Sequence, residues 1–145
     1  MSVEASPVRR GASFAPLPFL TLASRLLDEL THSGAVLGLP PELWFEPLPD
    51  DPLRVLRHGR TLATPFGVAA GPHTQLATGI VAAWLHGART IELKTIQQHA
   101  VEVATPCIRM ADEGLNTEWS QELAPSEALD QYLDAWFLVH ALHRR

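Results

Sequence analysis

The stretch that decides the fold runs from Thr64 to Thr95 and reads TPFGVAAGPHTQLATGIVAAWLHGARTIELKT. Residues 66–70 are short and apolar, which is typical of a strand buried on both faces. Residues 75–85 carry apolar side chains at helical spacing, so they predict a helix with one buried face. Residues 90–93 return as a second strand. The stretch therefore predicts two parallel strands joined by a helix.

The predicted helix has a start signal and a stop signal. Thr74 is a suitable N-cap, because its hydroxyl can accept a bond from a backbone N–H of the first turn. Gly87 suits the position just after the helix, where the backbone commonly turns left-handed. These two residues set the expected limits of the crossover between the strands.

The carboxyl ends of the two strands carry the residues that could hold a ligand. Ala69, Ala70 and Gly71 leave the first strand end almost bare, so a flat or phosphorylated ligand could approach its backbone closely. Lys94 and Thr95 stand at the end of the second strand. Parallel strands end on the same edge of a sheet, and ligands bind at that edge in α/β folds. We therefore expect the two ends to face one pocket.

Elements before this stretch are a helix and a hairpin. Apolar residues at helical spacing over 17–30 predict a leading helix. Two short apolar segments, 53–56 and 60–63, flank Arg57-His58-Gly59 and predict a β-hairpin. A hairpin that leads directly into a parallel strand suggests a plug at the N-terminal mouth of a barrel.

The chain is predicted to close with a helix over residues 126–143, started by Pro125 or Ser126. One face of this helix is expected to be marked by Leu129, Leu133, Trp136, Phe137, His140 and Ala141. The segment between Thr95 and this helix is irregular, and a long loop at a ligand-facing strand end usually has a function.

Two parallel strands alone do not form a stable sheet, because parallel sheets need several neighbours and both faces covered. The fold class predicted is therefore α/β, the N-terminal portion of a (β/α)8 TIM-type barrel, incomplete, with a leading helix and a β-hairpin. A complete barrel takes about 250 residues. Residues 1–16 are expected to be a flexible N-terminus and 17–145 a barrel fragment.

Composition excludes several kinds of function. The net charge of −5 argues against a nucleic-acid partner. No run approaches the ~20 apolar residues that a membrane span needs, and a cytoplasmic location is expected. Cys107 is a single cysteine, which cannot form an internal disulfide or hold an iron–sulfur cluster alone. His99 and the nearby glutamates show no metal-ligand spacing, so no metal site is expected.

The motifs resemble those of a known family. TPFG at 64–67 leading into AAG at 69–71, then LKT at 93–95 and the loop at Asn116, are similar to the FMN-binding barrel of dihydroorotate and dihydropyrimidine dehydrogenases. AGPHTQL at 70–76 and NTEWS at 116–120 are closer to the selenate reductase iron–sulfur subunit, a long multidomain flavoprotein related to the glutamate synthase small subunit. The resemblance runs from about Pro18 to the end, and covers a minor N-terminal part of the full-length relatives.

The resemblance assigns roles to individual residues. It implies that Ala69, Ala70 and Gly71 lie against the flavin of FMN, with backbone groups bonding it. Lys94 would face the pyrimidine edge, where a cation stabilises the reduced flavin, and Thr95 would add a hydroxyl bond.

Asn116 matches the loop asparagine that hydrogen-bonds the pyrimidine substrate in the dehydrogenases, a task that suits an amide because it offers both a donor and an acceptor. No residue here matches the catalytic base of the dehydrogenases, so none is assigned as catalytic.

The resemblance implies an electron-transfer oxidoreductase in which electrons pass from NADPH through FAD, 4Fe–4S centres and FMN to a small-molecule acceptor. The FAD, NADPH and iron–sulfur sites would lie in regions outside this chain. The chain by itself is expected to be inactive and to need the remainder of the barrel or a partner redox subunit. Two alternatives stay open: a non-catalytic interaction module that completes a barrel with another chain, and a phosphate-binding aldolase or isomerase barrel with a reactive amine at Lys94.

Overall fold

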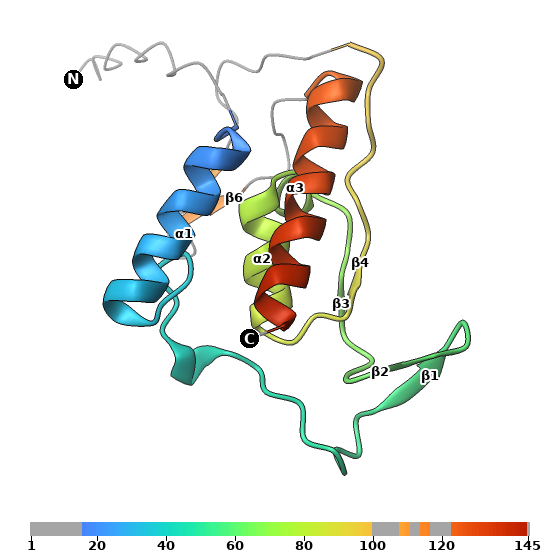
Figure 1. Cartoon of the computed structure of the whole chain (residues 1–145). Helices are drawn as coiled ribbons and strands as arrows, with labels where there is room; N and C mark the ends of the chain where they lie inside the picture. Colours follow the sequence, from blue (N-terminus) through green and yellow to red (C-terminus); the bar gives the residue numbers. More distant parts are fainter. Residues whose placement is uncertain (1–15, 100–107, 111–113, 117–122, 145) are drawn as a thin grey trace, which may run out of the picture.

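The structure is a computed structural model, and it describes residues 16–99, 108–110, 114–116 and 123–144. The expected flexible segment at residues 1–16 lies almost wholly outside the described residues. The helices and strands are α1 (Phe19–Ser33), η1 (Pro41–Leu43), β1 (Val55–Arg57), β2 (Arg60–Leu62), β3 (Gly67–Val68), η2 (Pro72–Thr74), α2 (Ala77–Leu85), β4 (Thr90–Ile91), β5 (Ile108–Met110), β6 (Gly114–Asn116) and α3 (Pro125–His143). Figure 1 shows α1, α2 and α3 side by side, with β3 and β4 along one side of them.

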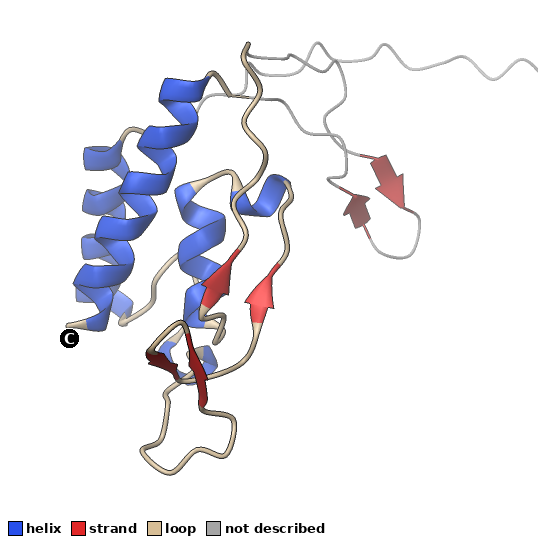
Figure 2. Ribbon diagram, turned by 90° about the vertical axis from the view of Figure 1, so that its right-hand side faces the viewer, coloured by secondary structure: helices blue, strands red, loops and turns tan. Residues whose placement is uncertain are grey.

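β3 and β4 form the predicted parallel pair. Gly67 lies opposite Thr90 and Val68 opposite Ile91. The pairing extends by one bond at each end, because the Arg89 N–H donates to the Phe66 carbonyl at 3.0 Å and the Glu92 N–H to the Val68 carbonyl at 2.9 Å. Figure 2 shows the two strands running in the same direction with helices on one side of them. The strand–helix–strand prediction is confirmed, although both regular strands are shorter than predicted.

The start of α2 differs from the prediction. The helix begins at Ala77 after Leu76, which provides no side-chain cap, so the prediction of Thr74 as N-cap is wrong. Thr74 is fully buried and closes the preceding turn η2 instead: its hydroxyl accepts the Gly71 N–H at 3.1 Å and donates to the Gly71 carbonyl at 3.0 Å. Pro72 starts η2, and this extra turn takes up residues that periodicity alone assigns to the helix.

The end of α2 follows the prediction. Gly87 has a φ of +100°, in the left-handed region that favours glycine, and its N–H donates to the Trp84 carbonyl at 3.0 Å. The chain then turns directly into β4.

The core lies between the three helices. Leu22 and Leu26 of the leading helix α1 are buried there, as expected for a helix that packs against a larger body. The residues buried together are Leu22, Leu26, Val36, Ala77, Ile80, Val81, Leu85, Ala135 and Leu138. Since most of these side chains come from α2 and its two neighbouring helices, α2 is the central helix of the described part of the chain.

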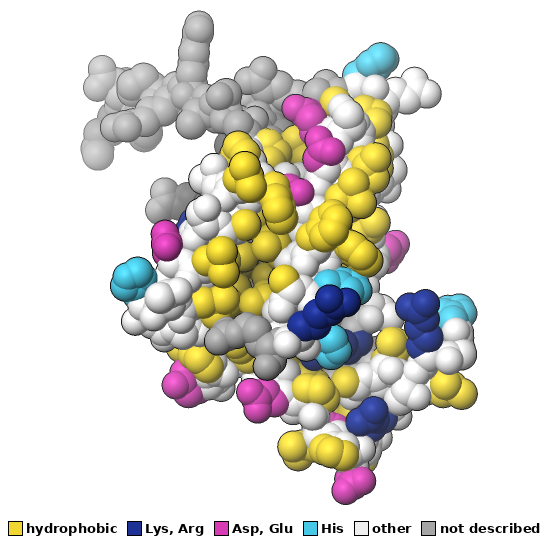
Figure 3. Space-filling view, viewed as in Figure 1, with side chains coloured by type: hydrophobic (Ala, Val, Ile, Leu, Met, Phe, Trp, Pro, Cys, Tyr) yellow, Lys and Arg dark blue, Asp and Glu magenta, His cyan; other side chains and the backbone are white. Residues whose placement is uncertain are grey.

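The buried face of α3 is not the predicted one. The residues of α3 that are buried are Ala128, Gln131, Ala135 and Leu138. Leu129, Trp136 and Phe137 are each 54% exposed and Leu133 is 46% exposed. The two alanines lie at helical spacing on the side that meets α2, where small side chains allow close approach. The larger apolar side chains lie along the outer surface of the molecule (Figure 3).

The N-terminal hairpin is confirmed, with slightly different limits. Val55 pairs with Leu62 and Arg57 with Arg60 in the antiparallel register. His58 and Gly59 form a two-residue turn with φ values of +48° and +72°, which is the backbone of a type I′ turn. Figure 2 shows this hairpin at the amino-terminal ends of β3 and β4. That is the end at which a plug was predicted.

A buried hydroxyl connects the exit of this hairpin to the end of α2. Thr64 is 1% exposed, and its Oγ1 donates to the Gly87 carbonyl at 2.6 Å. We expect Thr64→Val to lower the free energy of unfolding by about 1–3 kcal/mol, because it leaves a buried carbonyl without its donor. Faster hydrogen exchange of the amides in residues 85–92 would report the loss. Thr64→Ser keeps the hydroxyl, so its free energy of unfolding should fall by less than that of Thr64→Val. An equal decrease in the two variants would contradict this explanation.

β5 and β6 form a second antiparallel hairpin, with Ile108 opposite Asn116 and Met110 opposite Gly114. Residues 100–107, 111–113 and 117–122 lie outside the described residues, and Cys107 lies among them. Across the described ranges the sheets have two strands each and do not close into a barrel. No helix in those ranges is both long and apolar enough to span a bilayer.

Candidate functional site

The carboxyl ends of β3 and β4 lie together, as parallel pairing requires. Two hydrogen bonds link them: the Glu92 N–H donates to the Val68 carbonyl at 2.9 Å, and the Ala70 N–H donates to the Glu92 Oε2 at 3.4 Å. Ala69, Ala70 and Thr95 are exposed, whereas Gly71 and Lys94 are half-buried. The structure therefore brings the two predicted strand ends to one edge of the sheet.

The bare turn after β3 is occupied by a histidine ring. The His73 Nε2 lies 3.0 Å from the Ala69 carbonyl oxygen. A Cβ at Gly71 would lie 2.7 Å from the His73 Cε1, closer than real Cβ contacts. Gly71 has an extended backbone with a φ of −179°, which any residue can adopt, so a larger residue here would only have to displace the His73 ring from the turn.

Lys94 is held in place through its backbone. The Tyr132 hydroxyl on α3 donates to the Lys94 carbonyl at 2.9 Å. This bond fixes the end of the extended segment after β4 against α3, across 38 residues of sequence. A rigid backbone at this point limits where the ammonium group of Lys94 can reach, which matters for any role in positioning a ligand.

The segment that begins with β4 alternates between two faces. Ile91 packs against the helical core, and Leu93 contributes with Trp136 to a groove beside α3. Side chains alternate along an extended chain, so Thr90, Glu92 and Lys94 belong to the opposite face. That face carries a carboxylate and an ammonium two residues apart, next to the exposed turn at Ala70.

These groups are chemically suited to a polar, flat ligand. Ala69 and Ala70 are exposed and carry small side chains, but the Ala69 carbonyl already contacts the His73 ring and the Ala70 N–H already donates to Glu92. Lys94 supplies a cation for a negatively charged edge, and Glu92 supplies an acceptor for a ring N–H. The hydrogen-bonding groups of these residues and their exposure are compatible with part of a flavin site.

Two residues of this edge, Glu92 and His73, were not assigned a role from the sequence. The strict alternation of Thr90-Ile91-Glu92-Leu93-Lys94 contained a signal for Glu92, because it puts Glu92 on the same face as Lys94. No comparable signal existed for His73, since its contact depends on the tight turn at Pro72.

Asn116, the predicted substrate contact, ends β6 and pairs with Ile108 through the backbone. Its side chain lies outside what the structure describes. The substrate role of Asn116 stays a prediction.

Fold and edge together define the class: an α/β chain that contains the strand–helix–strand unit of a TIM-type barrel, with its polar groups at the carboxyl ends of the strands. The chain belongs to the family of the N-terminal TIM-barrel domain of oxidoreductase YgfK, whose model matches residues 37–145. This confirms the predicted class, an oxidoreductase TIM-barrel domain.

Two curated relatives carry the name "Putative oxidoreductase YgfK", from Escherichia coli strain K12 and from Escherichia coli O157:H7. Each is 45% identical to this chain over 133 residues, which is 91% of the chain. The chain spans 13% of the length of each relative. No solved structure matches the chain.

Proposed function

We propose that this chain supplies the first part of an FMN cradle in an oxidoreductase of the selenate reductase type. The observation that carries the proposal is the shared carboxyl edge, where the exposed Ala69–Ala70 backbone lies beside the Glu92–Lys94 segment. Membership in an oxidoreductase TIM-barrel family supports it, because such barrels bind ligands at this edge.

Bound FMN would supply the redox chemistry, accepting and passing on electrons. The chain's own part is to bind and orient. Backbone groups of Ala69, Ala70 and Gly71 would contact the flavin, and the Thr95 hydroxyl would add a bond. Lys94 would place its ammonium at the pyrimidine edge and stabilise negative charge there, while its carbonyl stays bonded to Tyr132.

The remaining strands of the barrel are proposed to come from the longer polypeptide that the relatives represent. Two features support this. β4 pairs with β3 along one edge, and within the described ranges no strand pairs with its other edge. Trp136 of α3 is 54% exposed, and it lines an apolar groove together with Ile91 of β4 and Leu93. NADPH, FAD, 4Fe–4S centres and the electron acceptor would bind elsewhere in that polypeptide.

The test is the flavin content of the complete oxidoreductase that contains this chain. We expect Lys94→Met to weaken FMN binding by roughly tenfold or more, because it removes a charged hydrogen-bond donor. The measurement is FMN released by acid and quantified per mole of protein, together with the reduction potential of the bound flavin, which should fall.

Lys94→Arg keeps the positive charge and should retain most of the FMN, whereas Arg60→Met in the hairpin should change nothing. Unchanged FMN content and potential in Lys94→Met would sink the role proposed for Lys94. Trapping of Lys94 by borohydride with a carbonyl compound would instead indicate the aldolase alternative.

A further inference from the structure

A cavity of about 490 Å³ lies at the end of the molecule where the hairpin meets the C-terminal ends of α2 and α3. This is the amino-terminal end of β3 and β4, opposite to the edge at Ala70. The Phe45 N–H donates to the Leu85 carbonyl at 2.7 Å, which fixes the segment after η1 against α2 and forms one wall of the cavity. The volume is in the range of roughly 300–1,000 Å³ that small-molecule pockets occupy.

Arg89 is held in this cavity by several contacts. Its guanidinium carbon lies 5.3 Å from the centre of the Phe45 ring and 5.0 Å from that of Trp84, so it is held by two aromatic rings. Its Nη1 donates to the Trp84 carbonyl at 2.8 Å and to the Ala88 carbonyl at 2.9 Å. Burial lowers the pKa of Arg89, but a guanidinium stays charged at neutral pH.

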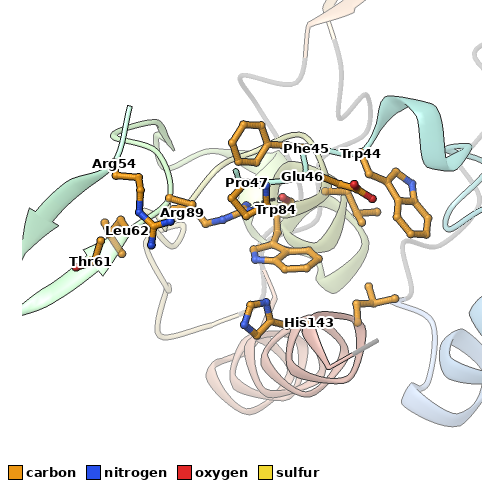
Figure 4. Close-up of a pocket in the computed structure, with 13 residues that line it drawn as sticks. Trp44, Phe45, Glu46, Pro47, Arg54, Thr61, Leu62, Trp84, Arg89 and His143 are labelled. Atoms are coloured by element: carbon orange, nitrogen blue, oxygen red, sulfur yellow. Dashed lines mark hydrogen bonds between the residues drawn. The ribbon is translucent and has the colours of Figure 1, made fainter. Parts of the chain in front are cut away.

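A second arginine shares the cavity. The Arg54 Nη1 donates to the Leu48 and Pro49 carbonyls at 3.4 Å and 3.3 Å. In Figure 4 Arg54 lies on the hairpin side of the cavity, and the Arg89 side chain extends from there toward Phe45 and Trp84, with His143 beyond Trp84. The His143 ring lies edge-on to the Trp84 ring, and the two ring centres are 6.2 Å apart.

Neither guanidinium pairs with a carboxylate of the described residues, among which the ion pair found is Arg25–Glu29. Glu46 also lines the cavity, but its carboxylate lies toward Trp44, away from the two arginines (Figure 4). The hydrogen bonds of Arg89 to described residues all come from its Nη1, so its Nε and Nη2 make none with that part of the chain. The guanidinium therefore keeps one edge for a planar or tetrahedral oxyanion.

We infer that this cavity binds a small phosphate monoester with a flat apolar body. Two guanidinium groups suit a doubly charged phosphate better than a single carboxylate. The rest of the cavity suits an aromatic or apolar group, because Leu62 and Leu142 join the rings of Phe45 and Trp84 in its lining. The inference does not depend on flavin binding, since it concerns the opposite ends of the strands.

Titration calorimetry on the complete oxidoreductase tests this with phenyl phosphate as the probe. We expect saturable binding, tighter than that of inorganic phosphate, with no binding of phenol. Arg54→Met should weaken phenyl phosphate binding about tenfold, and Arg89→Met at least as much. Arg60→Met removes an arginine outside the cavity and should leave the affinity unchanged.

Arg54 is exposed, so Arg54→Met tests the site even if Arg89→Met fails to fold. The FMN content of Arg54→Met should equal that of the wild type, which separates this test from the flavin test. Equal phenyl phosphate affinity in wild type and Arg54→Met would overturn the inference. No binding to the wild type would also overturn it.

Discussion

Gly79→Ala should destabilise the packing of α2 by about 1–3 kcal/mol or more. A Cβ at this position would lie 2.0 Å from the carbonyl oxygen and 3.0 Å from the carbonyl carbon of His73. Both are backbone atoms of η2, so no side-chain rotation relieves the contact, and either η2 or α2 must move. Helix propensity alone predicts the opposite sign, a gain of about 1 kcal/mol for alanine over glycine inside a helix.

Hydrogen exchange of peptides that cover residues 72–85 measures this effect directly. We expect faster exchange in Gly79→Ala and no loss of protection in Thr78→Ala, which shortens the neighbouring side chain and adds no atom. Slower exchange in Gly79→Ala would mean that helix propensity determines the stability of α2. The close approach of η2 to α2 would then not limit the residue at position 79. The displacement should also disturb the turn at Gly71, because η2 begins directly after it.

Gln131→Leu should lower the free energy of unfolding by about 1–3 kcal/mol. Gln131 is 6% exposed, and its Oε1 accepts the N–H of Ala77 at 3.1 Å, across 54 residues of sequence. Ala77 is the first residue of α2, whose N-terminus has no side-chain cap of its own. Leucine is of similar size but offers no acceptor, so the buried N–H of Ala77 loses its partner.

The control is Asp130→Leu, which adds an apolar side chain at the exposed neighbouring position of α3 and should change stability by less than about 0.5 kcal/mol. Earlier urea unfolding and faster exchange at the N-terminus of α2 should appear in Gln131→Leu alone. Equal stability of Gln131→Leu and the wild type would show that water replaces the lost acceptor.

The sequence predicted the elements whose signals are local. The apolar run before Gly71, the helical spacing that follows and the stop at Gly87 lie within one stretch of 32 residues, and the structure keeps their order. The His58-Gly59 turn was also readable, because few residue pairs accept two positive φ values. Thr74 was misread because its hydroxyl bonds backward to Gly71 rather than forward into α2.

The buried face of α3 could not be predicted from the size of its side chains. Apolar residues surround much of this helix, so large side chains did not identify the side that meets α2. The alanines at 128 and 135 decide that contact, because they let two helices approach. At the strand ends, pairing brought Ala70 and Glu92 together over 22 residues, a contact that depends on register rather than on composition.

The pairing of β3 and β4 with each other alone, among the described strands, has a consequence for biosynthesis. Domains emerge from the ribosome N-terminal part first, at about 5–20 residues per second. In a polypeptide as long as the relatives, this segment would be exposed to solvent for many seconds before later strands are translated. During that time the outer side of α3 and the strand edges of β3 and β4 that have no partner among the described residues would be targets for chaperones, and also points at which nascent chains aggregate.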